Sequence, residues 1–273
     1  MQNFSASPRE MVVSFWRNRQ LIRNLVQREV VGRYKGSMLG IFWSLATPIF
    51  MLAVYTFVFS VVFKARWGAG GSDSKTEFAL VLFAGLMIFN LFSECISRAP
   101  GLILANVNYV KKVVFPLEVL PWVSMGGALF HFAVSLGVWL VAYLALFGVP
   151  HWHVLLLPLV LVPLVLFVMG LSWALSSLGV YLRDVGQIIG LVITVLMFLT
   201  PIFYPASSLP PAYQPLMFLN PLTPPIEMAR DLLYWGHLPN MTLLAMYAAG
   251  SLACAVLGFA WFQKTRKGFA DVL

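Results

Sequence analysis

The stretch REVVGRYKGS, residues 28–37, runs directly into MLGIFWSLATPIFMLAVYTFVFSVVF, residues 38–63, so a cluster of cations precedes an apolar run that carries no charge. About 20 helical residues are enough to cross a hydrocarbon layer of about 30 Å. The run is long enough to do so with some tilt. We therefore expect the first membrane-spanning helix at 38–63.

The overall composition indicates that the rest of the chain is also embedded in a membrane. Hydrophobic residues make up 60% of the 273 positions and charged residues only 10%, and the mean hydropathy is +0.85. A soluble domain of this length carries more charge. We expect an all-α membrane protein with six transmembrane helices, the others lying at 78–96, 120–147, 154–180, 185–204 and 241–262.

Lys and Arg gather in alternate connections between these helices. One set holds Arg9, Arg17, Arg19, Arg23, Arg28, Arg33, Lys35, Arg98, Lys111, Lys112, Arg183, Lys264, Arg266 and Lys267, and the other holds Lys64, Arg66, Lys75 and Arg230. The positive-inside rule then predicts a multi-pass protein of the inner (cytoplasmic) membrane with both termini cytoplasmic and the amino terminus uncleaved. The net charge of +8 is therefore ascribed to lipid headgroups rather than to nucleic acid.

Residues 1–37 are expected to form a cytoplasmic amphipathic segment before the membrane domain at 38–273. Its apolar residues fall on one helical stripe: Val12, Phe15, Trp16, Ile22, Val26 and Val30. Two interpretations stay open. The helix lies on the membrane and turns its arginines toward headgroups or a partner, or it is an anchor with no further role.

Two further cytoplasmic segments connect the expected spans. Residues 98–116 predict a short amphipathic helix over 101–111, which either docks on another protein or packs on the ends of this chain's own spans. The short turn at 181–187 contains Arg183 and Asp184. For these two residues we expect a structural tie rather than a partner contact.

The segment 205–239 contains eight prolines among apolar residues, so it cannot form a straight spanning helix. Thr223 predicts the N-cap of a helix that ends at Gly236. Ile226 and Leu233 would contact the membrane or a partner, and Glu227, Arg230 and Asp231 lie within reach of one another. We expect a partly inserted external hairpin that borders a pathway.

No catalytic, cofactor or metal site is convincing in this sequence. Residues 70–76 imitate a phosphate-binding loop without its glycine spacing, and His151 and His153 lack a third ligand. Glu94 lies inside an expected span and is a functional candidate, because an unpaired charge there is costly. For His131 we expect a hydrogen bond to a neighbouring helix.

Aromatic residues follow one face of the first expected span. Trp43, Phe50 and Phe57 recur at seven-residue intervals, which places them on one helical stripe. Such rings stack on the apolar faces of sugars, although each ring alone is more commonly a packing residue.

Several segments together resemble the membrane subunit of ABC-type exporters of O-antigens, teichoic acids and related polymers. They are REVVGRYKGSMLGIFWSLATP at 28–48, VKKVVFPLEVLP at 110–121, YLRDVGQ at 181–187, TPIFYP from 200, and NPLTPPIEMARDLLYWG ending at 236. The resemblance implies a type-2 exporter fold, a homodimer, and a separate cytoplasmic ATPase that binds ATP and Mg²⁺. It also implies external re-entrant gate helices at 205–239 and an interface helix before residue 38.

The resemblance assigns expected roles to individual positions. Contacts to the ATPase fall on Asn106, Asn108, Tyr109, Lys111 and Lys112. Aromatics of the channel between the two subunits are Trp43, Phe50, Phe57, Phe198 and Tyr204. We hypothesise that Arg28, Arg33 and Lys35 attract the diphosphate of a polyprenyl-linked polysaccharide, while topology alone would also explain these cations. A teichoic acid or capsule permease, a membrane-embedded glycan enzyme and a scaffold remain alternatives.

Overall fold

The computed structural model describes residues 5–62, 67, 75–111, 115–210 and 212–273, and these residues form helices and connecting turns without a β-strand. The longer helices are α1 (Pro8–Arg17), α2 (Arg19–Arg33), α3 (Phe42–Tyr55), α4 (Lys75–Arg98), α6 (Leu120–Phe147), α7 (Leu157–Tyr181), α8 (Val185–Leu199), α10 (Thr223–Arg230) and α11 (Met241–Thr265). Short helices are η2 (Ala99–Gly101), η3 (Leu104–Asn106), α5 (Val107–Lys111), η4 (Leu117–Val119), η5 (Trp152–Leu156), η6 (Ala206–Ser208), α9 (Gln214–Leu219), η8 (Arg266–Gly268) and α12 (Phe269–Val272). Two π-helices, η1 (Thr56–Val62) and η7 (Asp231–Trp235), extend α3 and α10.

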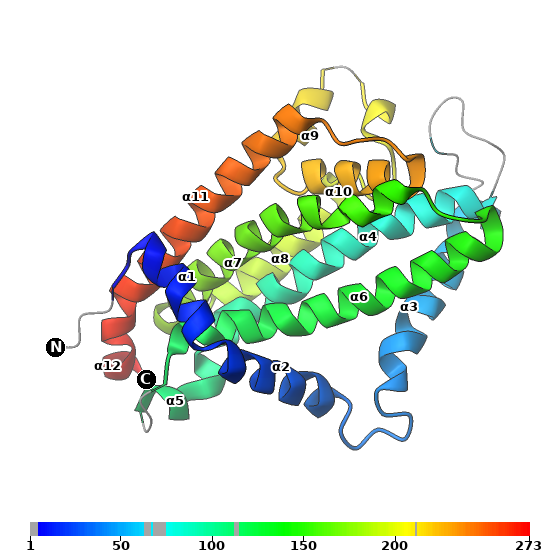
Figure 1. Cartoon of the computed structure of the whole chain (residues 1–273). Coiled ribbons are helices and arrows are strands. Elements are labelled where there is room, and N and C mark those ends of the chain that lie inside the picture. Colours follow the sequence, from blue (N-terminus) through cyan, green and yellow to red (C-terminus); the bar gives the residue numbers. More distant parts are fainter. Residues whose placement is uncertain (1–4, 63–66, 68–74, 112–114, 211) are drawn as a thin grey trace.

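Five helical segments of the described chain are long and apolar enough to cross a membrane. They are Phe42–Phe59, Thr76–Gly101, Leu117–Phe147, Trp152–Tyr181 and Met241–Val272. The expected span at 185–204 is helical only over the 15 residues of α8, about 22 Å at 1.5 Å per residue. The protein is thus a multi-pass membrane protein, and α8 is shorter than the expected sixth span. Helices α1 and α12, the first and last of the described helices, lie at the same end of the bundle (Figure 1).

Helix α4 lies at the centre of this bundle, with α6, α7, α8 and α10 packed around it (Figure 1). Its stretch from Phe78 to Phe89 is apolar on every face, as expected of a helix surrounded by other helices, and the side chains of this stretch are buried. The indole nitrogen of Trp139 on α6 donates a hydrogen bond to the Leu80 carbonyl at 2.9 Å. The bundle therefore holds the residues of α4 in fixed positions.

Helices α7 and α11 approach so closely that their backbones touch. A Cβ added at Gly258 would lie 2.0 Å from the carbonyl oxygen of Gly170, and one added at Gly170 would lie 2.4 Å from that of Cys254. Small residues permit such close contact between helices in a membrane, where burial of apolar surface does not drive association.

The start of the first span differs from the expectation. Residues 34–41 form turns and α3 begins at Phe42 rather than at 38. The expected single helix before it is also divided, because α1 and α2 meet at Asn18. Ile22 is buried against Val119 and Val123 at the start of α6. Val12 and Trp16 are exposed instead. The apolar stripe expected before residue 38 is therefore buried against this chain in α2 and exposed in α1.

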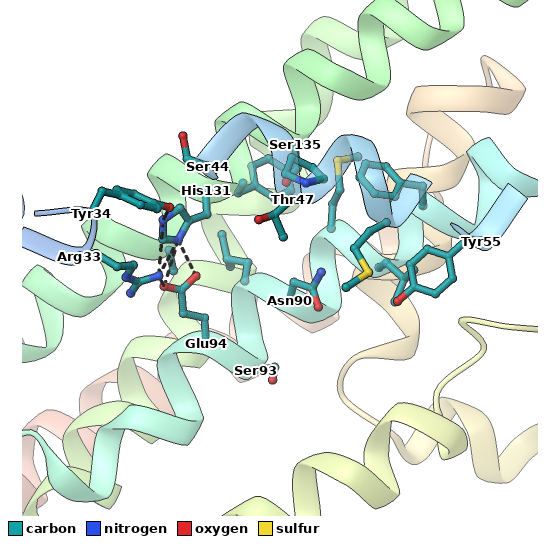
Figure 2. A pocket seen from close by; sticks show the side chains of 18 residues that line it. Arg33, Tyr34, Ser44, Thr47, Tyr55, Asn90, Ser93, Glu94, His131 and Ser135 are labelled. Carbon is teal, nitrogen blue, oxygen red and sulfur yellow. Dashed lines mark hydrogen bonds and ion pairs between the residues drawn. The ribbon is translucent and has the colours of Figure 1, made fainter. Parts of the chain in front are cut away.

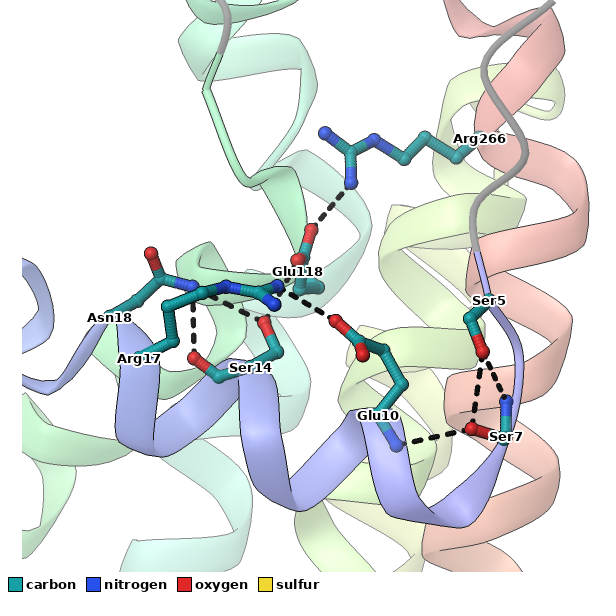
Figure 3. A network of polar contacts seen from close by, with 8 residues as sticks. All are labelled: Ser5, Ser7, Glu10, Ser14, Arg17, Asn18, Glu118 and Arg266. Carbon is teal, nitrogen blue, oxygen red and sulfur yellow. Dashed lines mark hydrogen bonds and ion pairs between the residues drawn. The ribbon is translucent and has the colours of Figure 1, made fainter.

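A polar cluster around Glu118 joins three distant parts of the chain (Figure 3). The Glu118 carboxylate accepts a hydrogen bond from the Ser14 hydroxyl of α1 at 2.9 Å and lies 2.5 Å from the Arg266 guanidinium after α11. The Glu118 carbonyl accepts from the Trp173 indole at 3.1 Å. A buried carboxylate needs such partners, and here they fasten α1 to the ends of α6 and α11.

The two irregular segments also differ from their expected forms. The helix expected over 101–111 is divided into η2, η3 and the five-residue α5, and Ala99 and Ile103 are buried in the chain's own core. At the opposite end, α10 begins at Thr223 after the N-cap Leu222, and the Thr223 hydroxyl makes no hydrogen bond within the described residues. Thr223 is therefore not the cap. Gly236 does end the helix, in the left-handed conformation at φ +66°.

Candidate functional site

Four polar residues from three elements meet at the end of the bundle where α2 stops. The Arg33 guanidinium lies 2.6 Å from the Glu94 carboxylate, and His131 Nδ1 lies 2.9 Å from the same group. The Tyr34 hydroxyl is 3.1 Å from His131 Nε2. A proton on Nδ1 lets His131 donate to Glu94 while Nε2 accepts from Tyr34. Burial raises the pKa of Tyr34, which keeps that phenol a donor.

This cluster answers both expectations for the buried polar residues of the spans. Glu94 is not an isolated charge, because a guanidinium and an imidazole contact it. The hydrogen bond from His131 to a neighbouring helix is confirmed. Together they tie the carboxyl end of α2 to α4 and α6.

The cluster lies at one end of a cavity of about 480 Å³ between α3, α4 and α6 (Figure 2). Tyr55 lies at the other end. Polar lining residues besides the cluster are Ser44, Thr47, Asn90, Ser93 and Ser135, and apolar ones include Met51, Phe83, Leu86, Met87 and Phe132. We call this space the hydroxyl-lined cavity.

A second cavity of about 720 Å³ lies between α2, the end of α4, and the segment of η2, η3 and α5. Arg28, Arg33 and Arg98 line it together with one carboxylate, that of Glu29. Glu29 forms an ion pair with Arg98, while Arg98 Nη1 is buried and makes no hydrogen bond within the described residues. We call this space the arginine cavity, and its guanidinium groups suit a phosphate or diphosphate.

Arg33 lines both cavities. Of the three cations expected at a lipid diphosphate, Arg28 and Arg33 therefore lie on one cavity. Lys35 is exposed in the turn after α2 and lines neither of the two.

Of the residues expected to contact an ATPase, some contact other parts of this chain and others are exposed. Tyr109 stacks on Phe115 with ring centroids 4.3 Å apart, and the Asn106 amide donates to the Leu102 carbonyl at 2.9 Å. Asn108 and Lys111 are exposed. Lys112 lies outside the described residues, so only Asn108 and Lys111 are seen on the open surface.

Arg230 is completely buried between α10, α4 and the chain after α8. It donates to the carbonyls of Val81 at 3.1 Å and Ile202 at 2.8 Å and pairs with Glu227 at 2.9 Å. Its guanidinium carbon also lies 4.3 Å from the centre of the Trp67 ring, a cation–π contact. Burial lowers its pKa to about 10, so the guanidinium stays charged at neutral pH.

Glu227 and Arg230 contact each other, as expected. The surroundings of their helix differ from the expectation. Ile226 and Leu233 are fully buried in this chain's own core, because α10 packs directly on α4. They contact neither lipid nor a partner. Asp231, between them in the chain, is half-buried, and its carbonyl accepts from the His237 amide at 2.9 Å.

The expected aromatic stripe is exposed on the single chain. Trp43 and Phe50 on α3 and Phe57 on η1 are 44%, 66% and 60% exposed, and Phe198 on α8 is 60% exposed. Tyr204 is half-buried and donates to the Phe198 carbonyl at 2.9 Å. These rings therefore remain free to contact lipid, another subunit or a ligand.

The turn before α8 shows no structural tie through its side chains. Arg183 and Asp184 are both exposed, and neither side chain makes a hydrogen bond or ion pair within the described residues. The phosphate-loop imitation at 70–76 falls mainly outside those residues. His153 stacks on Trp152 with ring centroids 4.2 Å apart.

Sequence reasoning missed Asn90, Arg98 and Glu118 as interaction residues. Asn90 stands out in hindsight as an amide in the middle of an apolar span. Glu118 gave no local signal, because its partners lie 104 and 148 residues away in the sequence.

Comparison with known proteins matches residues 20–234 to the family model of the ABC-2 type transporter. The O-antigen export system permease protein RfbA of Myxococcus xanthus is 30% identical over 96% of this chain and 98% of its own length. RfbA of Klebsiella pneumoniae is 28% identical over 91% and 93%. The polysialic acid transport protein KpsM of Escherichia coli is 23% identical over 89% and 92%. Since the family match takes in every helix that lines the two cavities, the chain belongs to the ABC-2 type transporter family.

Proposed function

We propose that this chain is the permease of an ATP-driven exporter that moves a lipid-linked polysaccharide across the inner membrane. The observation that carries the proposal is the similarity to O-antigen export permeases over nearly the whole chain. In this arrangement both termini lie in the cytoplasm and a separate ATPase supplies the energy. The cation bias of the terminal end supports that orientation.

The exposed residues of α5 support an ATPase contact at that end. Asn108 and Lys111 are open to solvent, while Ala99 and Ile103 of the same segment are anchored in the core. A segment held rigidly on one side and open on the other can transmit movement of a docked partner to the spans.

The exposed apolar faces of α3 and α8 support a homodimer with a channel between the subunits. Phe50 and Phe198 are each at least 60% exposed. Aromatic side chains are enriched where proteins meet one another, and their faces also suit the apolar faces of sugar rings.

The arginine cavity supports recognition of a lipid diphosphate. Arg28 and Arg33 line it with Arg98, and guanidinium groups bind phosphate oxygens in bidentate fashion. Charge reversal in Arg28→Glu, at a residue that lines this cavity alone and is exposed, should reduce export while leaving dimer and ATPase assembly intact. Unchanged export by this variant would leave topology as the role of these cations.

The proposed function is tested by coexpression with candidate ATPases, beginning with any that is encoded beside this chain. Copurification, ATP hydrolysis above that of the ATPase alone, and export of polysaccharide in a strain lacking its own exporter are expected. An assembled complex that exports nothing would refute the transport role. An Arg9→Glu variant, outside both cavities, is the matched control for charge reversal.

A second candidate is export of another polymer by the same architecture. Relatives named polysialic acid transport protein match at 22% and 23% identity. Teichoic acid and capsule export belong to this alternative. Supplying the strain with each polymer in turn distinguishes them, because only the transported one reaches the cell surface.

A further inference from the structure

Asn90 is an exposed residue within α4, a helix whose other central side chains are largely buried. Its amide points into the hydroxyl-lined cavity (Figure 2), and it makes no side-chain hydrogen bond within the described part of the chain. An amide in the middle of a membrane span is costly unless it finds polar partners. The Asn90 amide is therefore available to a polar group in the cavity, of a ligand or of water.

Neighbouring side chains on the cavity wall also have hydrogen-bonding groups without a partner among the described residues. The hydroxyls of Ser93 on α4 and Ser135 on α6 line the cavity and form no hydrogen bond with other described residues. Ser44 and Thr47 donate to the carbonyls of Ile41 and Trp43, at 2.7 and 2.9 Å, and the Thr47 oxygen keeps its acceptor lone pairs. The wall thus offers both donors and acceptors on facing helices.

The shape of the cavity suits a ring rather than a single water or ion. Its volume of about 480 Å³ lies within the usual range for small-ligand sites, about 300–1,000 Å³. Its lining on α4 extends from Phe83 to Glu94, about 16 Å at 1.5 Å per residue. Phe132 and Met87 add apolar surface beside the polar groups, as the two faces of a sugar ring require.

The charges at its end favour a neutral occupant. Arg33 Nη1 is already paired with Glu94 at 2.6 Å, so a phosphate inside this cavity would meet the Glu94 carboxylate, which the arginine cavity does not contain. A carboxylate has about four acceptor positions. Glu94 can therefore accept a hydroxyl of a neutral ligand without losing Arg33 or His131.

The two cavities are adjacent because Arg33 lines both. One offers guanidinium groups for a diphosphate, and the other offers hydroxyls, an amide and a carboxylate for a neutral polyol. In a lipid-linked polysaccharide the first sugar is bonded directly to the diphosphate. The phosphate-binding cavity and the hydroxyl-lined cavity are thus neighbours in the protein, as the diphosphate and the first sugar are in such a ligand.

We propose that the hydroxyl-lined cavity is a subsite for the sugar next to the diphosphate, with Asn90, Ser135 and Glu94 as its hydrogen-bonding residues. This inference rests on the proposed function. It differs from the channel proposed between the subunits, because the cavity lies between α3, α4 and α6 of one chain.

The test compares four ligands that differ only by the sugar or its absence. Citronellyl diphosphate and citronellyl diphosphohexoses carrying N-acetylglucosamine, glucose or galactose are titrated against the full chain in lipid nanodiscs, with empty nanodiscs as the blank. At least one sugar-bearing ligand should bind the unmodified protein about fivefold more tightly than the bare diphosphate. Asn90→Leu and Ser135→Ala should each remove most of that gain and leave the affinity for bare diphosphate unchanged.

The control variant is Thr194→Val, which changes a hydroxyl of α8 bonded to the Gly190 carbonyl and lining neither cavity. It should keep the full gain. Equal binding of all ligands by the unmodified protein overturns the proposal, and so does an Asn90→Leu variant that weakens every ligand equally. If no ligand binds while the complex still exports polysaccharide, the subsite is refuted and the proposed function stands. Sugar-dependent binding without any export refutes the transport role instead.

Discussion

The Arg33 guanidinium at the end of α2 lies 2.6 Å from the carboxylate of Glu94 on α4. Only about a third of the Arg33 side chain and a fifth of the Glu94 side chain remain exposed, and His131 contacts the same carboxylate. A partly buried charge with two partners is worth more than a surface ion pair. The end of the N-terminal helical pair is therefore fixed to the centre of the bundle.

Glu94→Gln should lower the free energy of unfolding by about 1–3 kcal/mol, because it leaves Arg33 without its counter-charge. Thermal unfolding of the purified protein measures the change. Glu10→Gln is the matched control, since the Glu10–Arg17 pair at 2.7 Å involves an Arg17 side chain that is 56% exposed. Its effect should stay below about 0.5 kcal/mol. Equal effects of the two substitutions would contradict the special role of the Glu94 pair.

Gly85→Ala should destabilise the protein because the added Cβ would lie 2.7 Å from Nη2 of the buried Arg230. Arg230→Met should cost about 3 kcal/mol or more, since it leaves Glu227 and several carbonyls without their donor. In the double variant the clash is gone, so the two costs should fall short of additivity by about 1 kcal/mol or more. A strictly additive cycle from unfolding measurements would show that Gly85 and Arg230 do not compete for space.

Gly258→Ala should separate α7 from α11 and lower the melting temperature, at a cost of about 1–3 kcal/mol. The reason is the 2.0 Å approach of the added Cβ to the Gly170 carbonyl oxygen. Gly250→Ala is the control on the same helix, because nothing lies within 4 Å of its added Cβ. The control should be neutral or slightly stabilising. Similar losses for both variants would contradict this account of the packing.

Asp231→Asn should raise the melting temperature at neutral pH. Burial and the nearby Glu227 raise the pKa of Asp231 above its ordinary value, so the folded state favours the protonated form. Stability from this group is fully present below the pKa of the unfolded chain and is lost as pH rises through the folded pKa. With solvent screening the gain at pH 7 is about 1–2 °C, and it should shrink toward pH 4. A gain that is the same from pH 4 to 8 would exclude ionisation as its cause.

Periodicity and length predicted most of the membrane architecture, since apolar runs such as 120–147 have few alternatives to a spanning helix. The exception at 185–204 has a local cause. Thr200 has an extended backbone and ends α8, and Pro201 follows it directly. Residues before proline are driven out of the helical region, so the proline that was grouped within the span in fact follows its end.

The site was less accessible to sequence reasoning because it depends on contacts between distant residues. Arg33, Glu94 and His131 were each singled out, but on separate grounds and with separate roles. Their meeting requires α2 to turn back onto α6, which no local pattern specifies. The same holds for Arg230, which sequence spacing placed only within reach of Glu227 and Asp231, while tertiary packing buries it completely.

The Glu118 cluster has a consequence for biogenesis. Ser14 leaves the ribosome long before Glu118, and Arg266 follows only after a further 148 residues. Until the last long helix has been inserted, the Glu118 carboxylate lacks its cation, and the surface on which α1 packs is incomplete. Docking of the first helix is thus one of the last steps in making this protein, so a nascent chain arrested before Arg266 would expose an unfinished N-terminal surface to quality-control proteases.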